Sequence, residues 1–142
     1  MQEAGASDVR FFEGDMRDPD AIEALIDAVD AWGPLDILVN NAGIQKTVSL
    51  KDLTRDTWDA IIAVNLSGAL HTMRHALPNM AERGYGRVIN IASVHGLVAS
   101  KDKAPYVAAK FGLVGLSKVA ALEYAHVGSK ESGGVQVKFM LC

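Results

Sequence analysis

The sequence predicts an α/β fold built on a doubly wound parallel sheet, and three observations support this. Short apolar runs typical of strands alternate with longer segments of helical periodicity. The helical segments between successive strands have about ten or more residues, as a crossover between parallel strands requires. Each apolar run ends in small or polar residues. The expected element order is therefore β-α-β-α-β-α-β, in one domain that spans residues 1–142.

The first part of the chain is expected to form a strand, a helix and a second strand. Residues 9–12 are β-prone and precede a turn. Asp18 is a good N-cap and Pro19 suits the first helical position, so a helix is expected from there to Gly33. Residues 35–39 are nearly all apolar, which predicts a strand that is covered on both faces.

The rest of the chain continues the alternation. One long helix is expected from about Thr54 to Arg83, because apolar residues recur along it in one stripe. Pro78 is expected to bend or loosen its last turns, since proline removes a backbone donor. Residues 87–91 are predicted to be the next buried strand, residues 106–124 another helix, and residues 135–141 a final strand.

Composition and charge exclude several classes of protein. The 142 residues carry 14 Lys and Arg against 17 Asp and Glu, a formal charge of −3, and neither sign is gathered into runs. Nucleic acid and anionic membranes are therefore not expected as partners. Cys142 is the single cysteine, so the chain can form no internal disulfide, and the cytoplasm is the expected compartment. The sequence shows no signal peptide and no membrane-spanning run.

Polar and small residues follow the predicted strands, at the edge where an open parallel sheet binds its ligands. Tyr106 and Lys110 lie further along the chain and one helical turn apart, so that a phenol and an ammonium share one helix face. A fixed cation beside a phenol favours the phenolate, which can exchange a proton with a carbonyl or an alcohol near neutral pH. The pair is therefore a candidate for acid–base chemistry.

Four features in this order resemble a known family. They are the run Asn40-Asn41-Ala42-Gly43 after a predicted strand, Asn65 in the long helix, Ser93 after the next strand, and Tyr106 with Lys110. Together they are similar to the short-chain dehydrogenase/reductases, over residues 9–137. The resemblance implies a Rossmann-like fold and an NAD(P)-dependent oxidoreductase, with NAD as the first expectation for the cofactor and NADP as the alternative.

The resemblance also implies roles for individual residues. Tyr106 would be the general acid/base, and Ser93 would form a hydrogen bond with the substrate oxygen. Lys110 would favour the phenolate of Tyr106 and bind the nicotinamide ribose. Asn65 would hold a water in a proton relay, and Asp15 would contact the adenine. The floor of the cofactor site would be formed by Asn41, Ala42 and Gly43.

A narrower resemblance concerns the substrate. Gln45, His95 and Lys103 are similar to the carboxylate-binding set of bacterial D-3-hydroxybutyrate dehydrogenases. With Ser93 and Tyr106 they would bind a small anionic hydroxy or keto acid, 3-hydroxybutyrate or acetoacetate. Two alternatives stay open: a short-chain reductase of another substrate, such as a 3-oxoacyl or sugar compound, and a truncated fragment without catalytic activity.

Two parts of the family pattern are absent from this sequence. The Gly-rich turn that carries the cofactor pyrophosphate does not precede residue 9, and the substrate loop does not follow residue 137. The chain is therefore expected to be an incomplete form of the fold that binds dinucleotide poorly by itself. The resemblance implies a homo-oligomer, a dimer or a tetramer, for the full-length protein.

The sequence predicts no metal site. His71 and His75 have the spacing of a zinc-binding pair on a helix, but no third ligand accompanies them. The two histidines are expected to lie on a solvated helix face.

Overall fold

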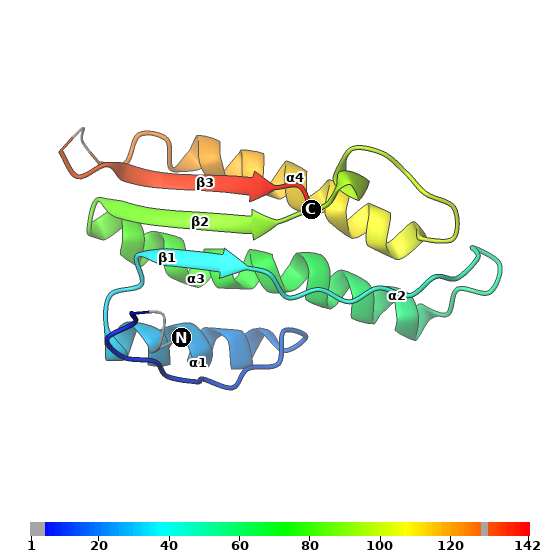
Figure 1. Ribbon diagram of the computed structural model, residues 1–142, viewed down its shortest axis with the longest axis horizontal. Helices are drawn as coiled ribbons and strands as arrows, with labels where there is room; N and C mark the ends of the chain where they lie inside the picture. Colours follow the sequence, from blue (N-terminus) through cyan, green and yellow to red (C-terminus); the bar gives the residue numbers. More distant parts are fainter. Residues whose placement is uncertain (1–4, 129–130) are drawn as a thin grey trace.

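The computed structural model of the chain describes residues 5–128 and 131–142. The centre of the fold in these residues is a sheet of three parallel strands in the order β1-β2-β3. The strands are β1 (Ile37–Asn40), β2 (Tyr85–Ile91) and β3 (Gly134–Met140). The helices precede and connect the strands (Figure 1), and they are α1 (Pro19–Trp32), α2 (Arg55–Ile62), α3 (Gly68–Glu82) and α4 (Ala104–Glu123). The predicted α/β class with a parallel sheet is confirmed.

The strand register brings the carboxyl ends of the strands to one edge of the sheet. Asn40 of β1 lies beside Asn90 of β2, which in turn lies beside Phe139 of β3. The residues that follow β1 and β2 therefore leave the sheet next to each other. This is the edge at which a parallel sheet binds ligands.

The described helices cover one face of the sheet and leave the other bare (Figure 1). Val88 of β2 is fully buried on the helical side, whereas Ile37 and Val39 of β1 are 55% and 52% exposed on the opposite side. The prediction that residues 35–39 are covered on both faces is therefore wrong for this chain. Apolar composition fits a strand with two covered faces, but a second layer of helices is not formed by the residues described.

Residues 9–12 do not form the predicted strand. They run beside α1 and away from the sheet (Figure 1), where the ring of Phe12 lies 5.9 Å from that of Trp32 and the guanidinium of Arg10 lies over Trp32. Phe11 is 90% exposed. A β-prone run becomes a strand only where a neighbouring strand pairs with its backbone, and these residues have no such neighbour in the described chain.

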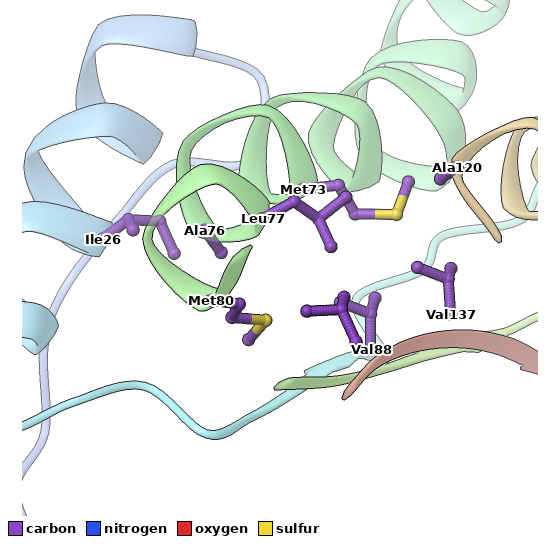
Figure 2. Close-up of a cluster of buried hydrophobic side chains, with 9 residues drawn as sticks. Ile26, Met73, Ala76, Leu77, Met80, Val88, Ala120 and Val137 are labelled. Carbon is purple, nitrogen blue, oxygen red and sulfur yellow. The ribbon is translucent and has the colours of Figure 1, made fainter. Parts of the chain in front are cut away.

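The predicted first helix is confirmed, and it belongs to the core. The Asp18 carboxylate accepts hydrogen bonds from the backbone N–H groups of Asp20 and Ala21, and α1 ends before Gly33. Figure 2 shows side chains from α1, α3, α4 and the sheet meeting in one cluster; it contains Ile26, Met73, Ala76, Leu77, Met80, Val88, Ala120, Val135 and Val137. Burial of this apolar surface holds the helices on the sheet.

The predicted long helix is present but is not uniform. α2 and α3 together run from Arg55 to Glu82, joined by a π-helical turn at Ala63–Ser67. Pro78 lies inside α3, which continues through it. The irregularity therefore occurs at the π-helical turn. This turn precedes the last turns of the helix, which the sequence predicts Pro78 to bend or loosen. Such turns are common at functional sites, and Asn65 lies at the centre of this one.

The fourth helix is long and apolar enough, by length and composition alone, to cross a membrane. In the fold, however, Leu113, Val114 and Ala120 of α4 are buried in the two core clusters. α4 therefore packs as a core helix, and it carries Tyr106 and Lys110 to the ligand edge of the sheet.

Candidate active site

Tyr106 and Lys110 form a pair in the first turns of α4. The Lys110 Nζ lies 5.6 Å from the centre of the Tyr106 ring and donates a 2.7 Å hydrogen bond to the carbonyl oxygen of Ile91, the last residue of β2. Lys110 is 4% exposed, and this burial lowers its pKa from the ordinary value, against a smaller opposing effect of the charge at Cys142. The structure thus fixes a cation beside the phenol, as the sequence predicts.

The turn that contains His95 and follows Ser93 packs against α4, which carries this pair. Ser93 precedes a 3-10 turn, Val94–Gly96, and its Oγ accepts a 3.2 Å hydrogen bond from the backbone N–H of His95. The imidazole of His95 meets the Tyr106 ring edge-on, with 5.8 Å between ring centres. The four side chains Ser93, His95, Tyr106 and Lys110 therefore form one group, which we call the Tyr106 cluster.

A glycine allows this close packing. A Cβ at Gly96 would lie 2.8 Å from Val114 and 3.0 Å from the carbonyl oxygen of Lys110, both in α4. Any other residue would push the 3-10 turn away from the helix. Gly96 therefore brings Ser93 and His95 to the helix that carries Tyr106.

Asn65 ties the π-helical turn to the chain that follows β1. Its amide nitrogen donates to the carbonyl oxygens of Ile44 (2.8 Å) and Ile61 (2.9 Å), and its Oδ1 accepts from the backbone N–H of Ile44. Both amide protons are thus engaged by backbone. A relay water beside Asn65, the predicted role, would have to contact Oδ1 or the backbone, and that role stays a prediction.

A partly buried chain of hydrogen bonds joins four elements behind the site. Thr72 of α3 donates to Oδ1 of Asn40 (2.8 Å), Asn40 donates to Asn90 (2.8 Å), and Asn90 donates to Ser117 of α4 (2.8 Å). Satisfied networks of this kind favour one arrangement of the elements that they connect. The predicted site does not include Thr72, Asn90 or Ser117. A polar residue within an apolar stripe of a helix or strand is the sequence pattern that could have indicated them.

Two of the predicted cofactor residues line a cavity. This cavity of about 210 Å³ is lined by Asn41 and Ala42 and by Met16, the neighbour of Asp15. Asn41, Ala42 and Gly43 are exposed, and so is Asp15, whose carboxylate binds the guanidinium of Arg17 through both oxygens. The structure therefore brings the segment at Asp15 and the bend after β1 to the same cavity.

Replacement of Arg17 by alanine is expected to raise the pKa of Asp15. Hydrogen bonds from the Arg17 side chain and backbone, together with its charge, hold this pKa at about 2, below the ordinary value of 3.8. Because the folded-state value is depressed, the pairing stabilises the fold above pH 3.8 and is lost as the pH falls toward 2. An NMR titration of the Asp15 carboxyl in the R17A variant measures the shift. Arg10→Ala, which removes the partner of Asp8, is the matched control, and an unchanged Asp15 titration in R17A would contradict the assignment.

The predicted carboxylate-binding residues are less tightly grouped. Among the described residues no hydrogen bond or ion pair connects Gln45 or Lys103 to His95; Gln45 borders a hollow beside α2, and Lys103 directly precedes α4. The imidazole of His95 is already bonded at both nitrogens, to Ser93 (3.3 Å) and to Ser100 (2.8 Å). Ser100 lies outside the predicted set, since a serine in an exposed loop carries no local signal. Of the candidate substrate set, the structure joins Ser93 to His95 by hydrogen bonds and His95 to Tyr106 by a ring contact.

Comparison with known proteins identifies the family. The model of the short chain dehydrogenase family matches residues 1–140. The chain belongs to this family. It is 58% identical to a D-beta-hydroxybutyrate dehydrogenase of Cupriavidus necator over 97 residues, 68% of this chain. It is 53% identical to one of Rhizobium meliloti over 115 residues, 80% of this chain. It is 39% identical over 117 residues, 82% of the chain, to a 3-oxoacyl-[acyl-carrier-protein] reductase of Staphylococcus aureus.

A solved structure of this family has the same fold. A gluconate 5-dehydrogenase of Burkholderia cenocepacia, in complex with NADP and tartrate, superposes with a TM-score of 0.80 at 35% identity and covers 88% of this chain. The chain spans 38%, 45% and 48% of the three relatives named above and 47% of this structure. It therefore corresponds to less than half the length of each.

The short-chain dehydrogenase family uses NAD(P), and the described residues fit part of such a cofactor. The ammonium of Lys110 has three donors, of which the described residues engage one, at Ile91. The two remaining N–H groups suit ribose hydroxyls, and the exposed bend at residues 41–43 follows β1 at the same edge of the sheet. No Gly-rich turn between a strand and a helix occurs in the described part of the chain, so residues for the pyrophosphate are not provided there.

Proposed function

We propose that this chain carries the catalytic part of an NAD(P)-dependent oxidoreductase that interconverts a small hydroxy acid and its keto acid. 3-Hydroxybutyrate and acetoacetate are the first candidates. The observation that carries the proposal is the Tyr106 cluster, in which Lys110 and the His95–Ser93 turn hold a phenol at the carboxyl edge of the sheet. A positioned phenol of this kind can transfer a proton to or from a substrate oxygen.

Three residues of the cluster have separate roles in this mechanism. The nicotinamide cofactor supplies or accepts the hydride when it is bound. The hydroxyl of Tyr106 gives a proton to the carbonyl oxygen of the keto acid, and it takes the proton back from the hydroxy acid. Ser93 donates a hydrogen bond to the same oxygen. Lys110, held by Ile91, stabilises negative charge on the phenol oxygen and binds the ribose through its two remaining donors.

The rest of the cofactor would lie along the bend and the cavity described above. In this proposal Asn41, Ala42 and Gly43 form the floor, and Asp15 contacts the adenine. Asn65 keeps the bend in place through Ile44 and contributes to a proton relay with water. Because NADP is bound in the gluconate 5-dehydrogenase structure, either nicotinamide dinucleotide is a candidate.

A small anionic substrate is supported by two lines of reasoning. Two relatives of more than half identity are D-beta-hydroxybutyrate dehydrogenases. The ammonium of Lys103 has no acceptor among the described residues, so it can bind a substrate carboxylate, and a charged donor makes the stronger kind of hydrogen bond. Gln45 and His95 would complete the set, with the carboxylate displacing Ser100 from the His95 ring. The 3-oxoacyl reductase relative makes a 3-oxoacyl thioester the second candidate substrate.

The substrate is tested in a chimera, because the chain covers 45% of the Rhizobium relative. In the chimera the 115 residues of this chain that match that enzyme replace the corresponding segment of it. We expect oxidation of NADH by acetoacetate, followed by absorbance, and a KM for acetoacetate that rises about 10- to 100-fold in K103A, since a hydrogen bond to a charged group contributes about 1.5–3 kcal/mol.

Lys101→Ala is the matched control, because Lys101 is an exposed lysine in the same loop. It is expected to leave the KM unchanged. A KM that K103A does not alter removes the carboxylate argument, and faster turnover of an acetoacetyl thioester favours the second candidate. A folded chimera that turns over neither compound contradicts the catalytic proposal.

A further inference from the structure

The imidazole of His95 bridges two serine hydroxyls. Its Nδ1 lies 3.3 Å from Oγ of Ser93, and its Nε2 lies 2.8 Å from Oγ of Ser100. A neutral imidazole has one nitrogen that donates and one that accepts. The two hydroxyls must therefore play opposite roles: when one donates to the ring, the other accepts from it.

The role of Ser93 decides what it can offer a substrate. A serine hydroxyl has one proton and two lone pairs, and Oγ of Ser93 already accepts from the backbone N–H of His95. If Nδ1 carries the imidazole proton, it fills the second lone pair, and the Ser93 proton remains for a ligand. If Nδ1 is unprotonated, the Ser93 hydroxyl donates its proton to the ring. Ser93 can then only accept a hydrogen bond from a ligand.

The geometry favours the first arrangement. The 2.8 Å separation at Nε2 is the usual length when a hydroxyl donates, whereas the 3.3 Å separation at Nδ1 is nearer to the longer range of bonds in which an N–H group donates. Ser100 is exposed, so its hydroxyl can turn toward the ring while water satisfies its lone pairs. Ser93 is 5% exposed and has no such exchange with solvent.

We propose that Ser100 is a positioning residue that sets the tautomer of His95. Its hydroxyl donates to Nε2, the imidazole proton stays on Nδ1, and Ser93 is left as a hydrogen-bond donor for the substrate oxygen. The last step rests on the proposed function; the first two concern this chain alone.

The arrangement serves both directions of the reaction. A carbonyl oxygen needs a donor, and an alcohol oxygen that gives its proton to Tyr106 can still accept from Ser93. A substrate carboxylate only accepts hydrogen bonds. It can therefore replace Ser100 as the partner of Nε2 only if that nitrogen becomes protonated. Nδ1 then still donates to Ser93, so Ser93 remains a donor.

The tautomer is measured directly on the 142-residue chain. Nitrogen-15 NMR of the imidazoles, at a pH where they are neutral, distinguishes protonated from bare ring nitrogens, and His95→Gln assigns the signal among the four histidines. We expect a protonated Nδ1 and a bare Nε2 for His95. Ser100→Ala should move the proton to Nε2, and Ser100→Thr, which keeps the hydroxyl, should restore it.

Ser49→Ala is the control, since this serine binds Asp52 elsewhere in the chain and should leave the His95 signals unchanged. A protonated Nε2 in the unsubstituted chain, or a tautomer that S100A does not alter, overturns the assignment. Circular dichroism of each variant confirms that the fold is kept.

The activity of the chimera separates this inference from the proposed function. The methyl ester of acetoacetate has no carboxylate that displaces Ser100, so S100A should lower kcat for the ester about tenfold, the upper range for one hydrogen bond, and S100T should recover it. A shifted tautomer with an unchanged kcat for the ester overturns the link to Ser93 as donor. Loss of the catalytic proposal itself would appear instead as a chimera without turnover, while the NMR result on His95 would stand.

Discussion

Tyr106→Phe is expected to reduce the rate of acetoacetate reduction by the chimera about 10³-fold, within the range of about 10²–10⁴ that a positioned general acid contributes. Phenylalanine keeps the ring that contacts His95 and Lys110 but removes the only group of this residue that can transfer a proton. The loss should therefore appear in kcat, with binding of the cofactor retained. Steady-state kinetics and NADH fluorescence measure the two quantities.

Tyr124→Phe is the matched control for this prediction. Tyr124 follows the end of the same helix and packs on the core, away from the ligand edge, so its hydroxyl should not affect the rate. Equal rates for Y106F and Y124F would show that the Tyr106 hydroxyl does not act in the reaction.

Gly86→Ala is expected to lower the free energy of unfolding by about 1–3 kcal/mol, as substitutions that overpack a core do. Gly86 lies in β2, where an added Cβ would be 2.6 Å from both Cβ and Cγ of Met80 in α3. Met80 is fully buried, and its Cβ is fixed to the helix backbone, so the side chain cannot simply rotate away. The strand and the helix would have to separate, which opens the core shown in Figure 2.

Gly115→Ala provides the opposite expectation within the same chain. Nothing lies within 4 Å of a Cβ at Gly115, which is in the interior of α4, so alanine should stabilise the fold by up to about 1 kcal/mol through its helix propensity. Urea unfolding followed by circular dichroism measures both variants. A G86A midpoint equal to that of the unsubstituted chain would contradict the packing of β2 against α3.

The loss of stability in G86A should also reach the active site. β2 ends at Ile91, which accepts the hydrogen bond of Lys110, and Ser93 follows two residues later. Asn90 of the same strand belongs to the partly buried hydrogen-bonded chain with Asn40. A displaced β2 would therefore move the partners of Tyr106 as well as the core.

Local sequence signals predicted the elements whose causes are local. The α1 helix begins after Asp18 because that carboxylate caps it, and the helix ends before Gly33. Tyr106 and Lys110 share one helix face because residues four apart always do so. Signals of this kind need no knowledge of distant parts of the chain.

Features that depend on distant partners were not predictable in the same way. Residues 9–12 have strand composition, but no strand pairs with them in the described chain. The π-helical turn around Asn65 is held by bonds to Ile44, 21 residues away. Ser100 became part of the site only because its loop folds back onto the ring of His95.

The sequence by itself determined the α/β class, the bounds of α1, and the residue types that assemble the Tyr106 cluster. The tertiary structure alone decided which face of the sheet is covered, which strand fails to form, and how the His95 ring is bonded. The physical reason is that helix periodicity and capping act over about four residues. Strand pairing, burial and side-chain hydrogen bonds, in contrast, depend on which distant groups reach one another when the chain folds.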